Sequence, residues 1–245
     1  CNDEIVLKHE NINDQGQQTN FMQLRTNIND EDTKDSVAVK KSNDVVRDVL
    51  TFENVSFGSK VIFTGTLMNK DTQSVMKSND ADIVSTVTLT VGNDGIISSS
   101  SGKATDVDII GVDLDTKTVT GTINLYYTYD SSKFEDVTLV SFVTAQDVNS
   151  NEEVAIHADY NDKLETIYYT SIHTNFNDRN TKTNDAKLGT TTLVDTISIN
   201  NLVYGKKYVV EGVLHTKDKD GKEIGILEDT LKKATITVSN TGEVT

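Results

Sequence analysis

Alternation of apolar and polar residues, not a helical period, is the main pattern along this chain. Three segments show it most clearly, with apolar residues at alternate positions: Val61, Phe63 and Leu67; Val87, Leu89 and Val91; Leu125, Tyr127 and Tyr129. A period of two in segments rich in Thr, Val and Tyr is typical of half-buried strands. Turn-forming sequences occur at Asn93-Asp94-Gly95, Asp220-Gly221 and Thr241-Gly242. We therefore expect an all-β protein built of β-sandwiches.

The sequence also repeats itself, at an offset of 147 or 148 residues. Matched pairs are His9 and His157, Thr26 and Thr174, Asp48 and Asp195, and Gly65 and Gly212. A unit of this length is too long for one turn of a solenoid and fits a whole domain. We expect residues 1–20 to end one repeat, residues 21–167 to form a complete immunoglobulin-like repeat, and residues 168–245 to begin a third. The last segment carries alternating apolar residues that half a sandwich cannot bury alone.

The charge of the chain argues against some classes of partner. It has 38 acidic and 23 basic residues and a formal net charge of −15 at pH 7, so it repels nucleic acids and anionic membrane surfaces. No run of 18 apolar residues occurs, and no membrane insertion is expected. The single cysteine, Cys1, has no internal disulfide partner. It is either left over from cloning, which we favour, or the lipid-bearing first residue of a lipoprotein.

Polar residues recur at the two ends of each repeat. The first strand carries a Thr and the next an Asp, and the last strand carries a His followed eight residues later by Gln17 or Glu165. First and last strands of a sandwich often lie side by side, which would bring a hydroxyl, an imidazole and a carboxylate together as in an activated nucleophile. Such residues at strand ends are more often ordinary exposed side chains, so this pattern alone does not establish chemistry.

Longer segments resemble a known family. They are Leu24-Arg25-Thr26, Asp195-Thr196 before Asn200-Asn201-Leu202, the strand from Tyr208 to Leu214, and the stretch from His9 to Gln17. These segments are similar to the Thr–Gln ester-bond-forming, immunoglobulin-like stalk repeats (VaFE repeats) of Gram-positive surface adhesins. The resemblance implies a cell-wall-anchored extracellular protein without a cofactor. In that family a Thr of the first strand attacks a Gln amide of the last strand, ammonia leaves, and His, Asp and Glu side chains assist.

Carried over residue by residue, the family's reacting set is incomplete in every repeat. The positions are Thr26, Asp48 and His157 in the complete repeat, with Glu165 in place of the Gln and Val143 in place of the helper Glu; Thr174 and Asp195 in the following repeat; and His9 and Gln17 in the preceding one. An ester between Thr26 and Glu165 would expel water instead of ammonia and would lack the helper. We therefore predict only a non-covalent contact there.

Other candidate sites are weaker. Asp218-Lys219-Asp220-Gly221 resembles the start of a calcium loop but lacks the later ligands, and we predict a hairpin turn. The acidic stretch Asn29–Asp35 is expected to be a solvated loop. His173 and His215 fit no metal-ligand spacing, so no metal is expected.

Three functions fit the sequence. We favour a stalk segment whose partners are neighbouring repeats of the same protein. The alternative is an adhesin module that binds a host protein or glycan through a long loop, Ser98–Lys117, with exposed Ile109, Ile110 and Val112. A hydrolase with a Thr or His–Asp centre is third, and the incomplete sites argue against an enzyme. The spare strand in residues 1–20 and the open edges of residues 168–245 also predict head-to-tail strand exchange between copies.

Overall fold

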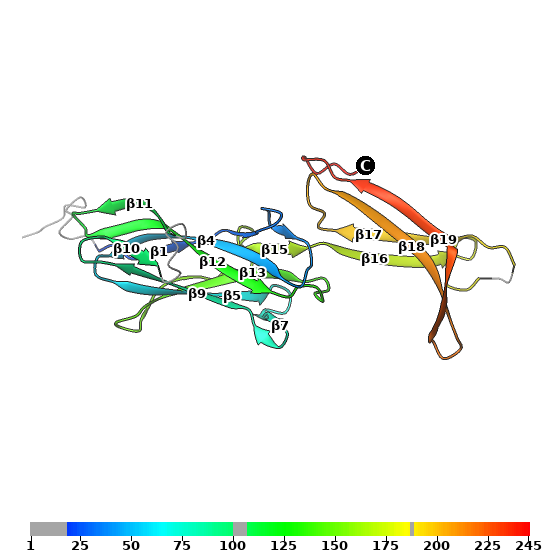
Figure 1. The fold of residues 1–245 in the computed structure, drawn as a ribbon, viewed down its shortest axis with the longest axis horizontal. Coiled ribbons are helices and arrows are strands. Elements are labelled where there is room, and N and C mark those ends of the chain that lie inside the picture. Colours follow the sequence, from blue (N-terminus) through cyan, green and yellow to red (C-terminus); the bar gives the residue numbers. More distant parts are fainter. Residues whose placement is uncertain (1–18, 100–106, 187–188) are drawn as a thin grey trace, which may run out of the picture.

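The computed structural model describes residues 19–99, 107–186 and 189–245, and its regular elements are all β-strands (Figure 1). They are β1 Gln23–Arg25, β2 Ile28–Asp30, β3 Val37–Ala38, β4 Asp44–Ser56, β5 Lys60–Asn69, β6 Ser74–Val75, β7 Lys77–Ser78, β8 Ala81–Asp82, β9 Val84–Val91, β10 Ile97–Ser99, β11 Val107–Asp113, β12 Thr118–Tyr129, β13 Thr138–Asp147, β14 Glu153–His157, β15 Thr166–Tyr169, β16 Ser171–Asp178, β17 Leu193–Asn200, β18 Lys207–Lys217 and β19 Glu223–Thr237. The described residues contain no helix that is long and apolar enough to span a membrane.

The first sheet of the sandwich holds the first strand of the repeat. β1 and β2 both pair antiparallel with β4, and β12 and then β11 continue the sheet. Thr26 and Asn27 lie in the break between β1 and β2. The backbone of Asn27 pairs with Val49 through N–O distances of 3.1 and 2.9 Å, so the register on β4 continues through the break and holds Thr26 in place.

The second sheet brings the last strand of the repeat against the first sheet. Its strands run in the order β10-β9-β5-β13-β15-β3, and β14 also pairs with β13. β13 has two partners on one edge, with residues 138–140 against β15 and residues 143–146 against β14. The chain between β14 and β15 passes Ser141, whose amide donates to the carbonyl of Glu165 at 3.0 Å. The amide of Ile28 donates to the carbonyl of Leu164 at 2.8 Å and joins the two sheets there.

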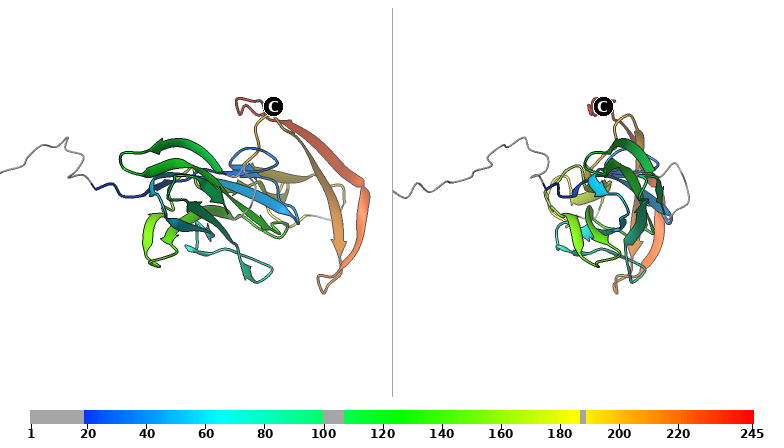
Figure 2. Two further views of the ribbon diagram at one scale, coloured as in Figure 1. Left: turned by 60° about the vertical axis from the view of Figure 1, so that its left-hand side comes forward. Right: turned by 90° about the vertical axis from the view of Figure 1, so that its left-hand side faces the viewer.

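The core lies between these two sheets, which Figure 2 shows obliquely and from one end. All nine apolar positions of the three alternating segments are buried, and Phe52 of β4 contacts Phe63 of β5 with 6.2 Å between ring centroids. Each large side chain buried in this way contributes about 1.5–3 kcal/mol. The all-β sandwich predicted from the alternation is confirmed.

A second unit follows Tyr169 and consists of two hairpins, β16–β17 and β18–β19 (Figure 1). It repeats local structure of the first unit. Oδ1 of Asp30 accepts the amides of residues 32 and 33, and Oδ1 of Asp178 accepts those of residues 180 and 181, all at 2.7–3.1 Å. Many of its apolar side chains are exposed, among them Ile172, Phe176 and Val209.

Two expectations need correction, and one lies outside the described residues. Ser98–Lys117 is not a single loop, because β11 pairs with β12 and Val107 packs against the core, although Ile109, Ile110 and Val112 are exposed as expected. The stretch Asn29–Asp35 is not a solvated loop throughout, because its first two residues belong to β2 and the Asp30 side chain is buried. His9 and Gln17 fall outside the described residues.

Candidate functional site

The structure places Thr26 against the last strand of its own repeat. The side chain is buried, and it influences the Glu165 carboxyl as a hydrogen-bonding neighbour. The backbone bond from Ile28 to Leu164 fixes the two segments on either side of this contact. The predicted approach of the first-strand Thr to the Glu165 position is therefore present in the fold.

Glu165 and Asp48 form a buried pair of carboxyls. Burial first, and the neighbouring Asp48 charge second, raise the pKa of Glu165 to about 9, while Thr26 opposes the shift. Burial also raises the pKa of Asp48, to about 6. The contacts stop short of formed hydrogen bonds, because Thr26 Oγ1, both Glu165 oxygens and Asp48 Oδ1 lack a partner within bonding geometry. Both shifts favour the protonated form, and the larger one falls on Glu165.

A chain of hydroxyls that was not foreseen from the sequence supports Asp48 from the other side. Ser141 Oγ donates to Asp48 Oδ2 at 2.7 Å, and Tyr127 Oη lies 2.8 Å from Ser141 Oγ. Because the single Ser141 proton goes to the carboxylate, Tyr127 donates to Ser141. The only sequence signal for Ser141 is its place two residues before Val143, on the same face of β13.

His157 and Val143 complete the surroundings. They are cross-strand partners on β14 and β13. His157 Nε2 lies 3.1 Å from Asp162 Oδ2, and His157 is close enough to Asp48 to act on its carboxyl electrostatically. Val143 is fully buried and apolar, so the position that the family resemblance gives to the helper Glu supplies no proton donor or acceptor.

Thr174 and Asp195 are differently placed. They lie on the paired strands β16 and β17, where Thr174 faces Ile197 and Asp195 faces Phe176 in the register, and both side chains are exposed. The other predicted members of such a set are not among the described residues around them. The structure thus brings together the four predicted residues of the complete repeat and leaves this second pair open.

Other candidate positions hold structural contacts. Asp218 Oδ1 accepts the amides of Asp220 and Lys222, both at 2.9 Å, so the predicted hairpin turn between β18 and β19 is confirmed. His173 pairs with Asp136 at 3.1 Å and His215 with Glu223 at 2.8 Å. The described residues contain no cluster of three or more potential metal ligands.

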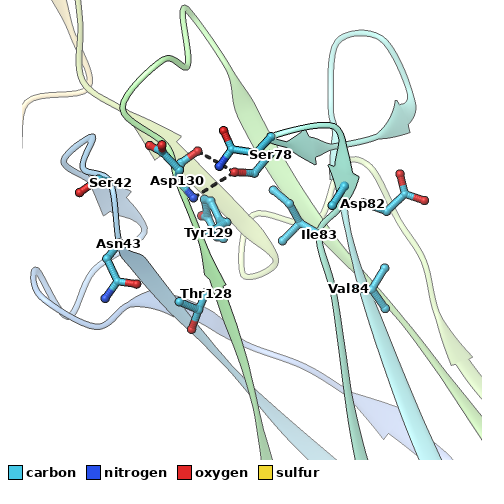
Figure 3. Close-up of a pocket in the computed structure, with 11 residues that line it drawn as sticks. Ser42, Asn43, Ser78, Asp82, Ile83, Val84, Thr128, Tyr129 and Asp130 are labelled. Atoms are coloured by element: carbon cyan, nitrogen blue, oxygen red, sulfur yellow. Dashed lines mark hydrogen bonds between the residues drawn. The ribbon is translucent and has the colours of Figure 1, made fainter.

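A surface pocket of about 320 Å³ lies away from this chemistry (Figure 3). It is bordered by the ends of β4 and β12 and by the β7–β8 hairpin, which Ser78 holds through two 3.0 Å hydrogen bonds with the backbone of Asp130. Its lining is mostly hydroxyl, amide and carboxylate groups, and it contains neither Thr26 nor Glu165. We assign no reaction to it.

The arrangement around Thr26 allows one kind of bond. A Thr26 Oγ–Glu165 Cδ bond would form as the Glu165 Cδ–OH bond breaks, with water as the leaving group. The dry site and the fixed contact favour such a step. The absence of an amide at residue 165 and of an acid at residue 143 disfavours it, so a non-covalent contact remains our prediction.

The chain was compared with curated proteins and with solved structures. A comparison with curated proteins found no relative of the chain. Among solved structures, a bacterial adhesin from Mobiluncus mulieris containing intramolecular disulfide, isopeptide and ester bond cross-links matches in two crystal forms. The identity is 12%, the TM-score is 0.45, and the match covers 91% of this chain and 95% of that chain. We draw neither fold nor function from a likeness this distant.

The family comparison is more specific. The T-Q ester bond containing domain matches twice, over residues 22–169 and over residues 170–245. The first match encloses the buried contact between Thr26 and Glu165, and the second begins where the two hairpins begin. The family is defined by an internal bond and not by turnover of an outside substrate. The chain therefore belongs to the family of T-Q ester bond containing domains.

Proposed function

We propose that this chain is part of the stalk of a bacterial surface adhesin, outside the cell and anchored to the wall of a Gram-positive organism. Family membership supports a repeat whose first and last strands are tied together. The observation that carries the proposal is the buried contact of Thr26, Glu165 and Asp48 between those two strands. In repeats that have all the reacting residues, an ester joins the first and last strands. In this repeat the contact between the two strands is non-covalent, and we call it the clasp. Neighbouring repeats would be the partners.

Single-molecule force spectroscopy tests this role. A stalk segment should resist extension as one unit, and Thr26→Val should lower the unfolding force of the sandwich because it removes the buried Thr26 hydroxyl that faces the Glu165 carboxyl. Thr86→Val is the matched control, since Thr86 is an exposed strand residue. Equal unfolding forces for Thr26→Val and the unsubstituted chain would contradict a clasp that bears tension.

One feature favours a second candidate function, that of a ligand-binding module. β11 is the last strand of its sheet, and it exposes Ile109, Ile110 and Val112. An exposed apolar edge can accept a strand or an apolar ligand surface. Protein and glycan arrays separate the two functions. Binding that Ile110→Asp abolishes would favour the module, and no binding would favour a stalk.

A further inference from the structure

The buried polar residues Thr26, Asp48, Ser141 and Glu165 form a first polar layer in the sandwich. A second buried polar layer lies beside it and is built from the same strands. On the first segment Asp30 follows Thr26 by four residues, and on β4 Asp44 precedes Asp48 by four residues. On a strand, a spacing of four returns to the same face. On β12 and β15, Tyr129 and Tyr169 belong to this second layer. Two polar layers thus cross the core and join the same first and last strands.

At the centre of the second layer lie two carboxyls, each with one oxygen that lacks a hydrogen-bond partner. Oδ2 of Asp44 accepts Ser131 Oγ and Tyr169 Oη, both at 2.8 Å. Tyr129 Oη lies 2.6 Å from Tyr169 Oη. Asp30 is 1% exposed and Asp44 0%, and the Asp30 carboxyl is a direct neighbour of the Asp44 carboxyl. Oδ2 of Asp30 and Oδ1 of Asp44 have no hydrogen-bond partner.

The following repeat has a hydrogen-bond donor at the position of Asp44. Asp178 is the repeat equivalent of Asp30, and Thr191, 147 residues after Asp44, is the equivalent of Asp44. There the Thr191 hydroxyl donates to Oδ2 of Asp178. A carboxyl can replace a hydroxyl as donor only when it carries a proton. Asp44 therefore has to be protonated to make the contact that Thr191 makes.

A carboxyl also replaces a neutral hydrogen-bond donor in the first layer. Glu165 stands where the preceding repeat has Gln17, a neutral amide donor, and it faces the carboxyl of Asp48. In both layers of this sandwich a carboxyl occupies the place of a neutral donor and lies against a second carboxyl. Two buried carboxylates in contact without a proton would repel each other at high cost.

We infer that the sandwich of residues 22–169 is locked by two buried protons, one shared by Asp30 and Asp44 and one shared by Asp48 and Glu165, and that alkali unlocks it. The inference concerns the folded sandwich and does not depend on a stalk role. Each proton gives a carboxyl the hydrogen-bond donor that the neighbouring repeats have as a Thr hydroxyl or a Gln amide. The ligand of both sites is H⁺.

Hydrogen bonding indicates where each proton resides. A proton shared by the two carboxyls would join Oδ1 of Asp44 to Oδ2 of Asp30, because the other oxygens already accept hydrogen bonds: Asp30 Oδ1 from two backbone amides, and Asp44 Oδ2 from Ser131 and Tyr169. Lys41 Nζ, 3.6 Å from Asp44 Oδ1, is the cation at this layer, and it also pairs with Asp32. Tyr129 and Tyr169 are its other titratable groups.

In the first layer the shared proton would join Glu165 to Oδ1 of Asp48, because Oδ2 of Asp48 already accepts from Ser141. The titratable groups that face this pair are Tyr127 on β12, His157 on β14, and Asp162 in the segment before β15.

The direction of the pH effect follows from the raised pKa values. The pKa of Glu165 rises from 4.5 to about 9, and burial and the Asp30 charge raise the pKa of Asp44. A proton held more tightly by the folded state stabilises it fully below the unfolded pKa, and the stabilisation is lost as pH rises through the folded pKa. For the Glu165 pair, stability should fall from about pH 4.5 to about pH 9. Each such proton changes the unfolding equilibrium constant by up to about tenfold per pH unit.

Denaturant unfolding of the 245-residue chain across this pH range tests the lock. The free energy of unfolding should fall with pH in the unsubstituted protein. Asp44→Asn and Glu165→Gln each supply a permanent amide donor, so each should remove part of the slope, and the double variant should remove most of it. Intact mass of Glu165→Gln identifies any molecule that has lost ammonia, and such molecules are left out of the comparison. Asp115→Asn, at an exposed carboxyl, should keep the full slope.

Two results would overturn the inference. One is an undiminished slope in both amide variants. The other is a carbon-13 NMR titration of the unsubstituted protein in which every Asp and Glu carboxyl is ionised at neutral pH, a measurement that does not require any variant to fold. Asp44→Thr copies the pair of the following repeat and should also lose the slope. If added Ca²⁺ or Na⁺ stabilises the unsubstituted protein and not Asp44→Asn, the Asp30 pair binds a cation and the proton assignment there is wrong.

Discussion

Thr26 and Glu165 differ from the family's reacting pair by one group, a hydroxyl where the amide nitrogen would be. We expect the complete repeat to contain no ester, because water is the leaving group and Val143 offers no proton transfer. Tandem mass spectrometry of a digest should find Thr26 and Glu165 in separate peptides. A peptide pair joined through these two residues, lighter by one water, would refute this prediction.

Supplying the two missing groups should restore the reaction. Val143→Glu with Glu165→Gln provides both the helper acid and the amide, next to Asp48 and across from His157. We expect the loss of one ammonia in the intact mass. A cross-link closing a loop of more than 100 residues should stabilise the sandwich by about 4–5 kcal/mol. The same double variant carrying Thr26→Val is the control, and it should keep the ammonia. Unchanged mass and melting temperature in the double variant would count against the residue assignments.

At the scale of the strand, close packing around Tyr127 depends on a glycine. A Cβ at Gly65 of β5 would lie 1.9 Å from Tyr127 Oη, inside the first polar layer. Gly65→Ala should therefore displace the Tyr127–Ser141 hydrogen bond and destabilise the sandwich by about 1–3 kcal/mol. Gly212→Ala is the matched control, because Gly212 is the repeat equivalent on β18 and a Cβ there meets nothing within 4 Å. The denaturation midpoint should be lower for Gly65→Ala than for Gly212→Ala. Equal midpoints would contradict this packing.

Strands with a clear local pattern were predictable, and strands defined by a distant partner were not. Leu89, Phe63 and Leu125 are buried as predicted, because the alternating pattern depends only on residues that are close in the sequence. β11 was predicted as part of a loop. Its exposed apolar residues carry no alternation, and its strand character comes from pairing with β12.

The candidate site divides in the same way. Thr26, Asp48 and Glu165 could be predicted because the resemblance and the internal repeat single them out. Ser141 and the Asp30–Asp44 pair could not, because their contacts join different strands or cross from one sheet to the other. The four-residue spacing from Thr26 to Asp30, and from Asp44 to Asp48, is the signal that could have revealed the second layer.

For the molecule as a whole, the open hairpins should make copies of the 245-residue chain associate. β16–β19 expose many apolar residues, including Phe176 and Val209. Residues 1–20 match the last strand of the same repeat type, so we predict that they add to these hairpins in another copy. Deleting residues 1–19 should shift size-exclusion profiles towards the monomer and expose the hairpins to protease. If neither changes, strand exchange does not occur.

The path of the chain through the sandwich decides how its bonds fail under extension. The chain enters near β1 and leaves through β15 at the opposite end (Figure 1). A pull on the two ends therefore runs along β2 and β15, while the hydrogen bonds of the flanking ladders lie across the strands. This is a shear geometry, in which many bonds share the force and must break together. In the opposite case, peeling, they would break one at a time. The two polar layers lie across this shear plane, so the buried polar contacts between the first and last strands are placed to resist sliding.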